Sequence, residues 1–235
     1  MDSTVPICPL LQTWAYRFES GFVVKSKRLS PERMNQEALR TLRESGMIYV
    51  TGEIFSRTRG DRLFCFEHNT GIGKTQWVTR EFIPYLRRQN QAVAFINIET
   101  FFPVGRIMHE ECGQKEIEDC FDRVLETINS AGQACEYLVL DECDLLFPSK
   151  EKPVQKNVNK TLYFDPYFSS YQKKAWEIIR GLKSQGKKII LISWLHPQDI
   201  SLATSYLGDR NFLMVFDAPV FEIEALPLDD QFKGL

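Results

Sequence analysis

The chain has 235 residues, 43% hydrophobic and 26% charged, which is ordinary for a globular protein and enough to bury a core without disulfide or metal staples. The net charge of −2 neither requires nor excludes a nucleic-acid partner. The sequence has no apolar run of about 18 residues, no charged and apolar leader, and no C-x-x-C pair among its six cysteines. We therefore expect a cytoplasmic protein with neither a membrane span nor a zinc site.

Regular elements begin after an N-terminal segment that we expect to be irregular, residues 1–30. A helix is predicted from Ser30, a typical N-cap that is followed by proline, to about Ser45. Gly46 then provides a stop signal. The apolar segment 47–55 is ambiguous between strand and helix.

The rest of the chain alternates between the two kinds of element. Strands are predicted over residues 62–68, 92–98, 137–140, 188–193, 212–216 and 220–225. Helices are predicted over residues 73–88 (with a kink at Pro84), 114–130, 168–184 and 197–207. Such alternation predicts an α/β fold, a three-layer parallel sheet of about five strands with helices on both faces.

Residues 68–75, HNTGIGKT, follow the phosphate-loop pattern G-x-x-x-x-G-K-[ST], except that His68 stands where the first glycine is expected. Glycines in such a loop let backbone N–H groups approach phosphate oxygens, and the following helix points its positive end at the anion. Lys74 can reach the β- and γ-phosphates, and the Thr75 hydroxyl can ligate Mg²⁺. The residues expected to bind ATP are Asn69, Thr70, Gly71, Ile72, Gly73, Lys74, Thr75 and Gln76.

An acidic pair, Asp141 and Glu142, follows the apolar run 137–140. Ligands gather at the carboxyl ends of the strands in an open α/β sheet, so Asp141 is expected beside the phosphate loop, where it would hold Mg²⁺ through water. Glu142 could polarise the attacking water as a general base. The 67 residues from Lys74 to Asp141 leave room for an extra strand between the two motifs, which distinguishes the additional-strand ATPases from simple kinases.

Two other phosphate-loop classes fit less well. A GTPase needs N-K-x-D, and the nearest match, residues 159–162, lacks the aspartate. A nucleoside kinase usually has an arginine-rich lid, which is not evident, and it needs no glutamate directly after the aspartate.

The strand after the acidic pair ends in the polar residue Ser193. From here the chain resembles the AAA+ ATPases, over roughly residues 45–230. The resemblance implies that Ser193 orients the attacking water and that Arg210 reaches the γ-phosphate of a neighbouring subunit in a homo-oligomer. Residues 221–230 resemble the junction at which the family's helical lid begins, and we expect that lid to be missing. The predicted division is an N-terminal extension (1–46), an ATPase core (47–230) and a tail (231–235).

Within AAA+ proteins, the short length and N-terminal helix look most like the ATPase regulators of DNA transposition and the helicase loaders, which implies action on DNA. Lysines and interleaved aromatics follow the acidic pair and could give salt-dependent contacts to double-stranded DNA. The lysines expected to do so are Lys150, Lys152, Lys156 and Lys160.

Three hypotheses remain open from the sequence. The first is an oligomeric Mg-ATP-hydrolysing enzyme acting on DNA. The second is a nucleotide-gated module that binds a protein partner with little turnover, which His68 and the expected loss of the lid favour. The third is an inactive structural subunit. Glu142 favours the first, because a pure binder has no need of a base there.

Overall fold

The computed structural model describes residues 15–18, 21–24, 31–52, 73–103, 106, 111–146, 169–193 and 218–223. Its described strands form one seven-stranded sheet in the order β1-β2-β7-β3-β6-β5-β4. Every neighbouring pair from β7 to β4 is parallel. These five core strands are β3 (Met47–Gly52), β4 (Val93–Asn97), β5 (Tyr137–Asp141), β6 (Lys188–Ile192) and β7 (Val220–Ile223). The predicted parallel α/β sheet is confirmed, and the ambiguous segment 47–55 contains its central strand.

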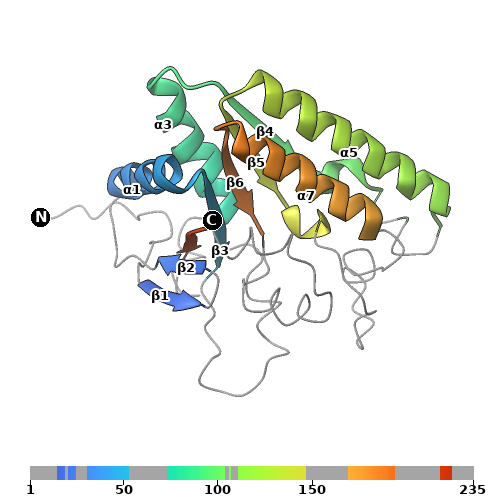
Figure 1. The fold of residues 1–235 in the computed structure, drawn as a ribbon, viewed down its shortest axis with the longest axis horizontal. Helices are drawn as coiled ribbons and strands as arrows, with labels where there is room; N and C mark the ends of the chain where they lie inside the picture. The colour runs from blue at the N-terminus through green and yellow to red at the C-terminus, as the bar shows by residue number, and fades with distance from the viewer. Residues whose placement is uncertain are drawn as a thin grey trace, which may run out of the picture.

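Helices cover both faces of this sheet (Figure 1). On one face lie α5 (Gln114–Ala134) and α7 (Ser169–Ser184). On the other lie α1 (Pro31–Ser45) and a continuous helical run, α2–η1–α3 (Lys74–Arg88). Because successive strand residues point to opposite faces, β3, β5 and β6 are apolar and buried over most of their length, as expected for strands covered on both sides.

The expectation that residues 1–30 are irregular was wrong for part of that segment. Strands β1 (Ala15–Phe18) and β2 (Gly21–Val24) form an antiparallel hairpin, and β2 pairs parallel with β7. The hairpin thus extends the sheet beyond β7. Such short segments carry little periodicity of their own, and their pairing with a strand from the other end of the chain leaves no local signal.

A kink was predicted at Pro84, and the structure has a π-helical turn just before this residue. Residues Val78–Phe82 (η1) form a π-helical turn directly before α3 (Ile83–Arg88), and Pro84 lies in the first turn of α3. Proline has no N–H to donate but is tolerated in the first turn of a helix, and single π turns occur within α-helices. The run therefore stays continuous to Arg88.

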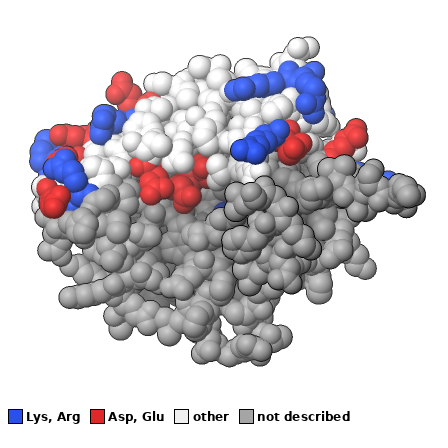
Figure 2. Space-filling model, turned by 180° about the vertical axis from the view of Figure 1, so that it is seen from behind, with Lys and Arg blue, Asp and Glu red and all other residues white. Residues whose placement is uncertain are grey.

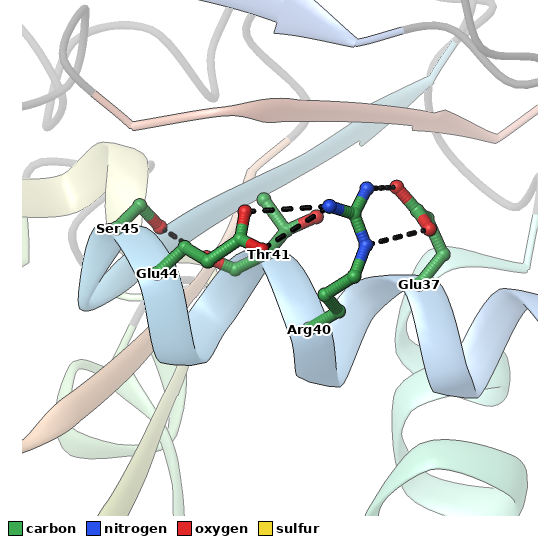
Figure 3. A network of polar contacts seen from close by, with 5 residues as sticks. All are labelled: Glu37, Arg40, Thr41, Glu44 and Ser45. Atoms are coloured by element: carbon green, nitrogen blue, oxygen red, sulfur yellow. Dashed lines mark hydrogen bonds and ion pairs between the residues drawn. The ribbon is translucent and has the colours of Figure 1, made fainter.

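The end of α1 sets the start of β3 (Figure 3). The Ser45 Oγ lies 2.7 Å from the Thr41 carbonyl oxygen and 2.6 Å from the Met47 carbonyl oxygen. Gly46 has φ 75° and its N–H donates to the Leu42 carbonyl at 2.9 Å, so it ends the helix as predicted. These hydrogen bonds end α1 and leave no loop between the helix and the central strand β3.

The outer face of α1 carries exposed ion pairs. Arg40 pairs with Glu37 one turn before it and with Glu44 one turn after it, the latter at 3.2 Å (Figure 3).

Among the described residues, no helix is long and apolar enough to cross a membrane.

Candidate nucleotide-binding site

Polar residues gather where the central strands end. Asn97, the last residue of β4, pairs in register with Asp141, the last residue of β5. Ser193 directly follows β6, and its N–H donates to the Val50 carbonyl of β3 at 3.1 Å. Thr51, next along β3, is fully buried. Because all these strands are parallel, the four polar residues lie along the same edge of the sheet, the edge at which α/β proteins bind ligands.

The helical run beyond the phosphate motif begins at this edge. Gly73 has φ 96° and ψ 12°, a left-handed conformation that glycine adopts without penalty, and its carbonyl accepts the Trp77 N–H at 2.8 Å. The Lys74 side chain is only 8% exposed. The Trp77 indole is completely buried and donates to the Asn35 side-chain oxygen at 3.1 Å, which fixes the start of the run against α1.

The two predicted motifs meet directly. The Thr75 Oγ1 lies 3.0 Å and 3.1 Å from the two carboxylate oxygens of Asp141, although the residues are 66 positions apart in the sequence. The Asn97 side-chain nitrogen lies 3.4 Å from the same carboxylate. The beginning of the helical run and the ends of two strands therefore converge on one carboxyl group.

Burial raises the pKa of the Asp141 carboxyl above its ordinary value of 3.8. Asp141 is only 1% exposed to solvent. The hydrogen bond from Thr75, the backbone N–H of Glu142 and the charge of Lys74 all act in the opposite direction and lower the pKa. A cation placed beside this carboxylate would replace the lost hydration and favour its charged form.

Glu142 lies in a backbone conformation that is rare for its residue type. Its φ is 52°, in the left-handed region, where a non-glycine residue costs about 1–3 kcal/mol. The chain continues into a buried 3-10 turn, η3 (Cys143–Leu146). Gln172 and Trp176 of α7 donate side-chain hydrogen bonds to the last two carbonyl oxygens of η3, at 3.1 Å and 2.7 Å. These contacts hold the turn that orients Glu142.

The polar atoms at the edge suit a hard divalent cation. The Thr75 hydroxyl and the Asp141 carboxylate are oxygen donors, and the Asn97 Oδ1 is buried without a hydrogen-bond partner among the described residues. No cluster of three His, Cys, Asp or Glu side chains able to hold a metal occurs in the described part of the chain. This donor set matches Mg²⁺, which usually takes one or two carboxylates and completes its shell with water and substrate phosphates.

The structure thus brings together six of the predicted residues, Gly73, Lys74, Thr75, Asp141, Glu142 and Ser193. Gln76 lies on the same first turn, where it is exposed. Sequence reasoning missed Asn97, although a polar residue ending an apolar strand was the same signal that identified Ser193. The remaining predicted residues lie outside the described part of the chain: Asn69, Thr70, Gly71, Ile72, Lys150, Lys152, Lys156, Lys160 and Arg210.

No family model and no curated protein matches the sequence. Among solved structures, the chain is similar to a replication initiator DnaA bound to AMPPCP and single-stranded DNA, at 18% identity and a TM-score of 0.48, over 83% of this chain and 45% of that one. It is also similar to domain III of Thermotoga maritima DnaA, at 15% identity and a TM-score of 0.45, over 83% of this chain and 62% of that one.

A third similar structure is a Walker-type ATPase of Pyrococcus abyssi, at 11% identity and a TM-score of 0.44, over 86% of this chain and 55% of that one. The chain therefore spans about half the length of the solved structures it matches. Similarity at these levels concerns the fold alone.

Proposed function

We propose that this chain binds and hydrolyses Mg-ATP at the edge formed by β3, β4, β5 and β6, as an AAA+-like ATPase. The observation that carries the proposal is the contact between Thr75 and both oxygens of Asp141. A hydroxyl at the start of a helix and a carboxylate at the end of a buried strand are brought together from distant parts of the chain. Phosphate-loop ATPases need this pair to hold a nucleotide-bound magnesium ion.

The other residues then take distinct roles. Lys74, at the start of the helical run, binds the β- and γ-phosphates, and the N-terminal N–H groups of the run add positive potential. Glu142 accepts a proton from the attacking water, and Ser193 orients that water. Thr75 and Asp141 would hold Mg²⁺, with Asn97 positioning the Asp141 carboxylate. When bound, the ion supplies positive charge against the phosphate oxygens.

Two variants test this assignment through ATP binding and hydrolysis. Lys74→Ala should weaken ATP binding at least about 30-fold, since truncating one partner of a buried charge pair costs about 2–5 kcal/mol. Glu142→Gln should keep ATP bound but lower turnover about 10²–10⁴-fold, because only the base is lost. Arg80→Ala, exposed on the same helical run, is the matched control and should change neither quantity.

The second candidate function is the nucleotide-gated protein-binding module, which His68 in the phosphate motif favours. It shares the ATP site with the first candidate but has no use for a base. Under it, ATP still binds through Lys74, turnover is negligible and Glu142→Gln changes nothing. Absence of any ATP binding would reject both candidates and leave the inactive structural subunit.

We further propose that the ATPase is oligomeric, with Arg210 acting on a neighbour's nucleotide, and that it acts on DNA. On the face shown in Figure 2, basic and acidic side chains of the described residues are interspersed. DNA contact is assigned to Lys150, Lys152, Lys156 and Lys160, as the sequence suggested. Double-stranded DNA should raise the Lys74-dependent ATPase rate, and higher salt should remove the increase.

Neutralising those lysines (Lys150, Lys152, Lys156 and Lys160 to Ala) should abolish DNA stimulation without changing the rate measured in its absence. A DNA effect that survives this change would contradict the assignment. For the trans arginine, Arg210→Ala mixed with Glu142→Gln should recover activity that neither variant has alone.

A further inference from the structure

We propose that the phosphate loop of this chain starts at Gly52, the last residue of β3, and that residues 53–68 are an insertion which ATP binding does not require. The inference rests on the proposed ATP site and deepens it, since it assigns a new residue to the site. It also replaces His68 as the first position of the loop.

The first argument is the position of β3 in the sheet. A phosphate loop connects a buried strand to the helix that packs on it. Strand β3 ends at the edge that carries Asp141 and Ser193, and its residue Val50 packs in the same buried cluster as Trp77 and Val78 of the following helical run. Strand β3 and this run are therefore the strand and the helix that such a loop joins.

The second argument is that the central position in the sheet is already taken. Strand β3 is hydrogen-bonded to β6 on one side and to β7 on the other. The other edge of β6 is paired with β5, and the other edge of β7 with β2. A strand has only two edges, so β6 and β7 have no free edge for a further strand. The strand predicted over residues 62–68 falls outside the described residues.

The third argument is the length and sequence of the connection. Twenty residues (53–72) separate Gly52 from Gly73, where the pattern G-x-x-x-x-G-K-[ST] has four, so the excess equals the length of segment 53–68. If that segment is left out, the sequence reads GNTGIGKT and matches the pattern at every position, including the first glycine. The single departure at His68 is thereby explained.

An insertion at this point is physically tolerable. The N–H groups that surround a bound phosphate belong to the residues next to the helix, and the left-handed Gly73 and the buried Lys74 keep their places there. Extra length on the strand side mainly adds loop-closure entropy, which grows slowly. Lengthening a loop from four to twenty residues reduces the closed population roughly tenfold.

The test is ATP affinity, measured by titration calorimetry with Mg²⁺, of the full chain and of a variant lacking residues 53–68, each with and without Lys74→Ala. We expect the shortened chain to bind ATP as tightly as the full chain or up to roughly tenfold tighter, and Lys74→Ala to weaken binding at least about 30-fold in both. If the shortened chain is folded by circular dichroism but binds ATP more than tenfold more weakly, the inference is wrong although the ATP site stands. If the full chain itself binds no ATP, the proposed function fails and the inference fails with it.

A second pair of variants in the full chain decides the matter if the shortened chain does not fold. Gly52→Val should weaken ATP binding at least tenfold, because a branched side chain blocks close approach to the phosphate, while valine suits a strand end. His68→Val should leave the affinity unchanged. The opposite result, with His68 sensitive and Gly52 insensitive, would place the start of the loop at position 68 and overturn the inference.

Discussion

The two halves of the candidate site are built in different ways. The acidic half, defined as β5 and η3 (Tyr137–Leu146), continues from a fully buried strand into a turn packed in the core. The phosphate half, defined as the end of β3 and the start of the helical run (residues 51–52 and 73–77), consists of two described segments that twenty residues separate in the sequence. The acidic half takes its geometry from the packed core, whereas the phosphate half brings together two segments that are not continuous in the sequence.

This difference separates the expected effects of mutation. Truncating the buried apolar side chains in and around the acidic half removes core packing and should reduce the free energy of unfolding even without ligand. Changes in the phosphate half should act more on nucleotide binding, because the proposed phosphate contacts lie at the start of the helical run. Four variants test this contrast, described from the largest expected effect to the smallest.

Trp176→Ala should destabilise the protein by about 3–5 kcal/mol, since it removes a buried aromatic ring and the hydrogen bond to the end of η3. Urea unfolding followed by circular dichroism measures the change. Trp176→Phe keeps most of the ring volume and should lose much less, with the absent hydrogen bond contributing about 1 kcal/mol. Equal losses for both variants would show that η3 depends on the hydrogen bond and not on packing.

Gly73→Ala should destabilise the protein by about 1–2 kcal/mol, because alanine is strained at φ 96°. ATP affinity should fall as well, since the same residue starts the helix facing the phosphates. The matched control is Gly181→Ala inside α7, where an added Cβ meets nothing within 4 Å and should stabilise by about 0.4–1 kcal/mol. Thermal melting of both variants gives the sign, and a stabilising Gly73→Ala would contradict the left-handed geometry.

Asp141→Asn should make the protein more stable at neutral pH when a chelator removes divalent cations. Burial raises the pKa of this carboxyl, so the folded state keeps its proton to a higher pH than the unfolded chain. Stability is therefore lost as the pH rises from the unfolded pKa through the raised folded pKa, and the amide avoids that loss. Thermal melts from pH 4 to pH 8 should show the advantage of the variant growing with pH.

With Mg-ATP present, the order should reverse, because only the wild-type carboxylate would hold the ion and gain stability from the ligand. A variant less stable than wild type at every pH without ligand would instead mean that the hydrogen bonds from Thr75 and Asn97 outweigh the burial of charge.

Arg40→Ala on the outer face of α1 should change stability by about 0.5 kcal/mol or less. Its partners Glu37 and Glu44 are solvent-accessible, and exposed ion pairs of this kind contribute little. The difference should shrink further at high salt. This variant is the reference for changes in both halves of the site. If it altered ATP affinity, the effects of the other variants could not be attributed to the half of the site in which each lies.

Much of the fold could be predicted because its signals are local. The helix start at Pro31, the Gly46 stop and the apolar runs at 93–97, 137–141 and 188–192 follow from backbone sterics and burial in the sheet. Lys74, Thr75, Asp141 and Glu142 were predicted because their motifs place fixed chemistry at fixed spacing. The pairing of β2 with β7 could not be predicted, since it joins opposite ends of the chain.

By itself, then, the sequence determined which residue types the site has and that strands alternate with helices, because side-chain chemistry and periodicity are properties of neighbouring residues. Only the tertiary structure decided that Met47–Gly52 is the central strand, that Asn97 lies against Asp141, and that Glu142 follows in a left-handed turn held by α7. These facts depend on which strand edges and buried atoms meet across the sheet, and contacts between distant segments leave no pattern in either segment alone.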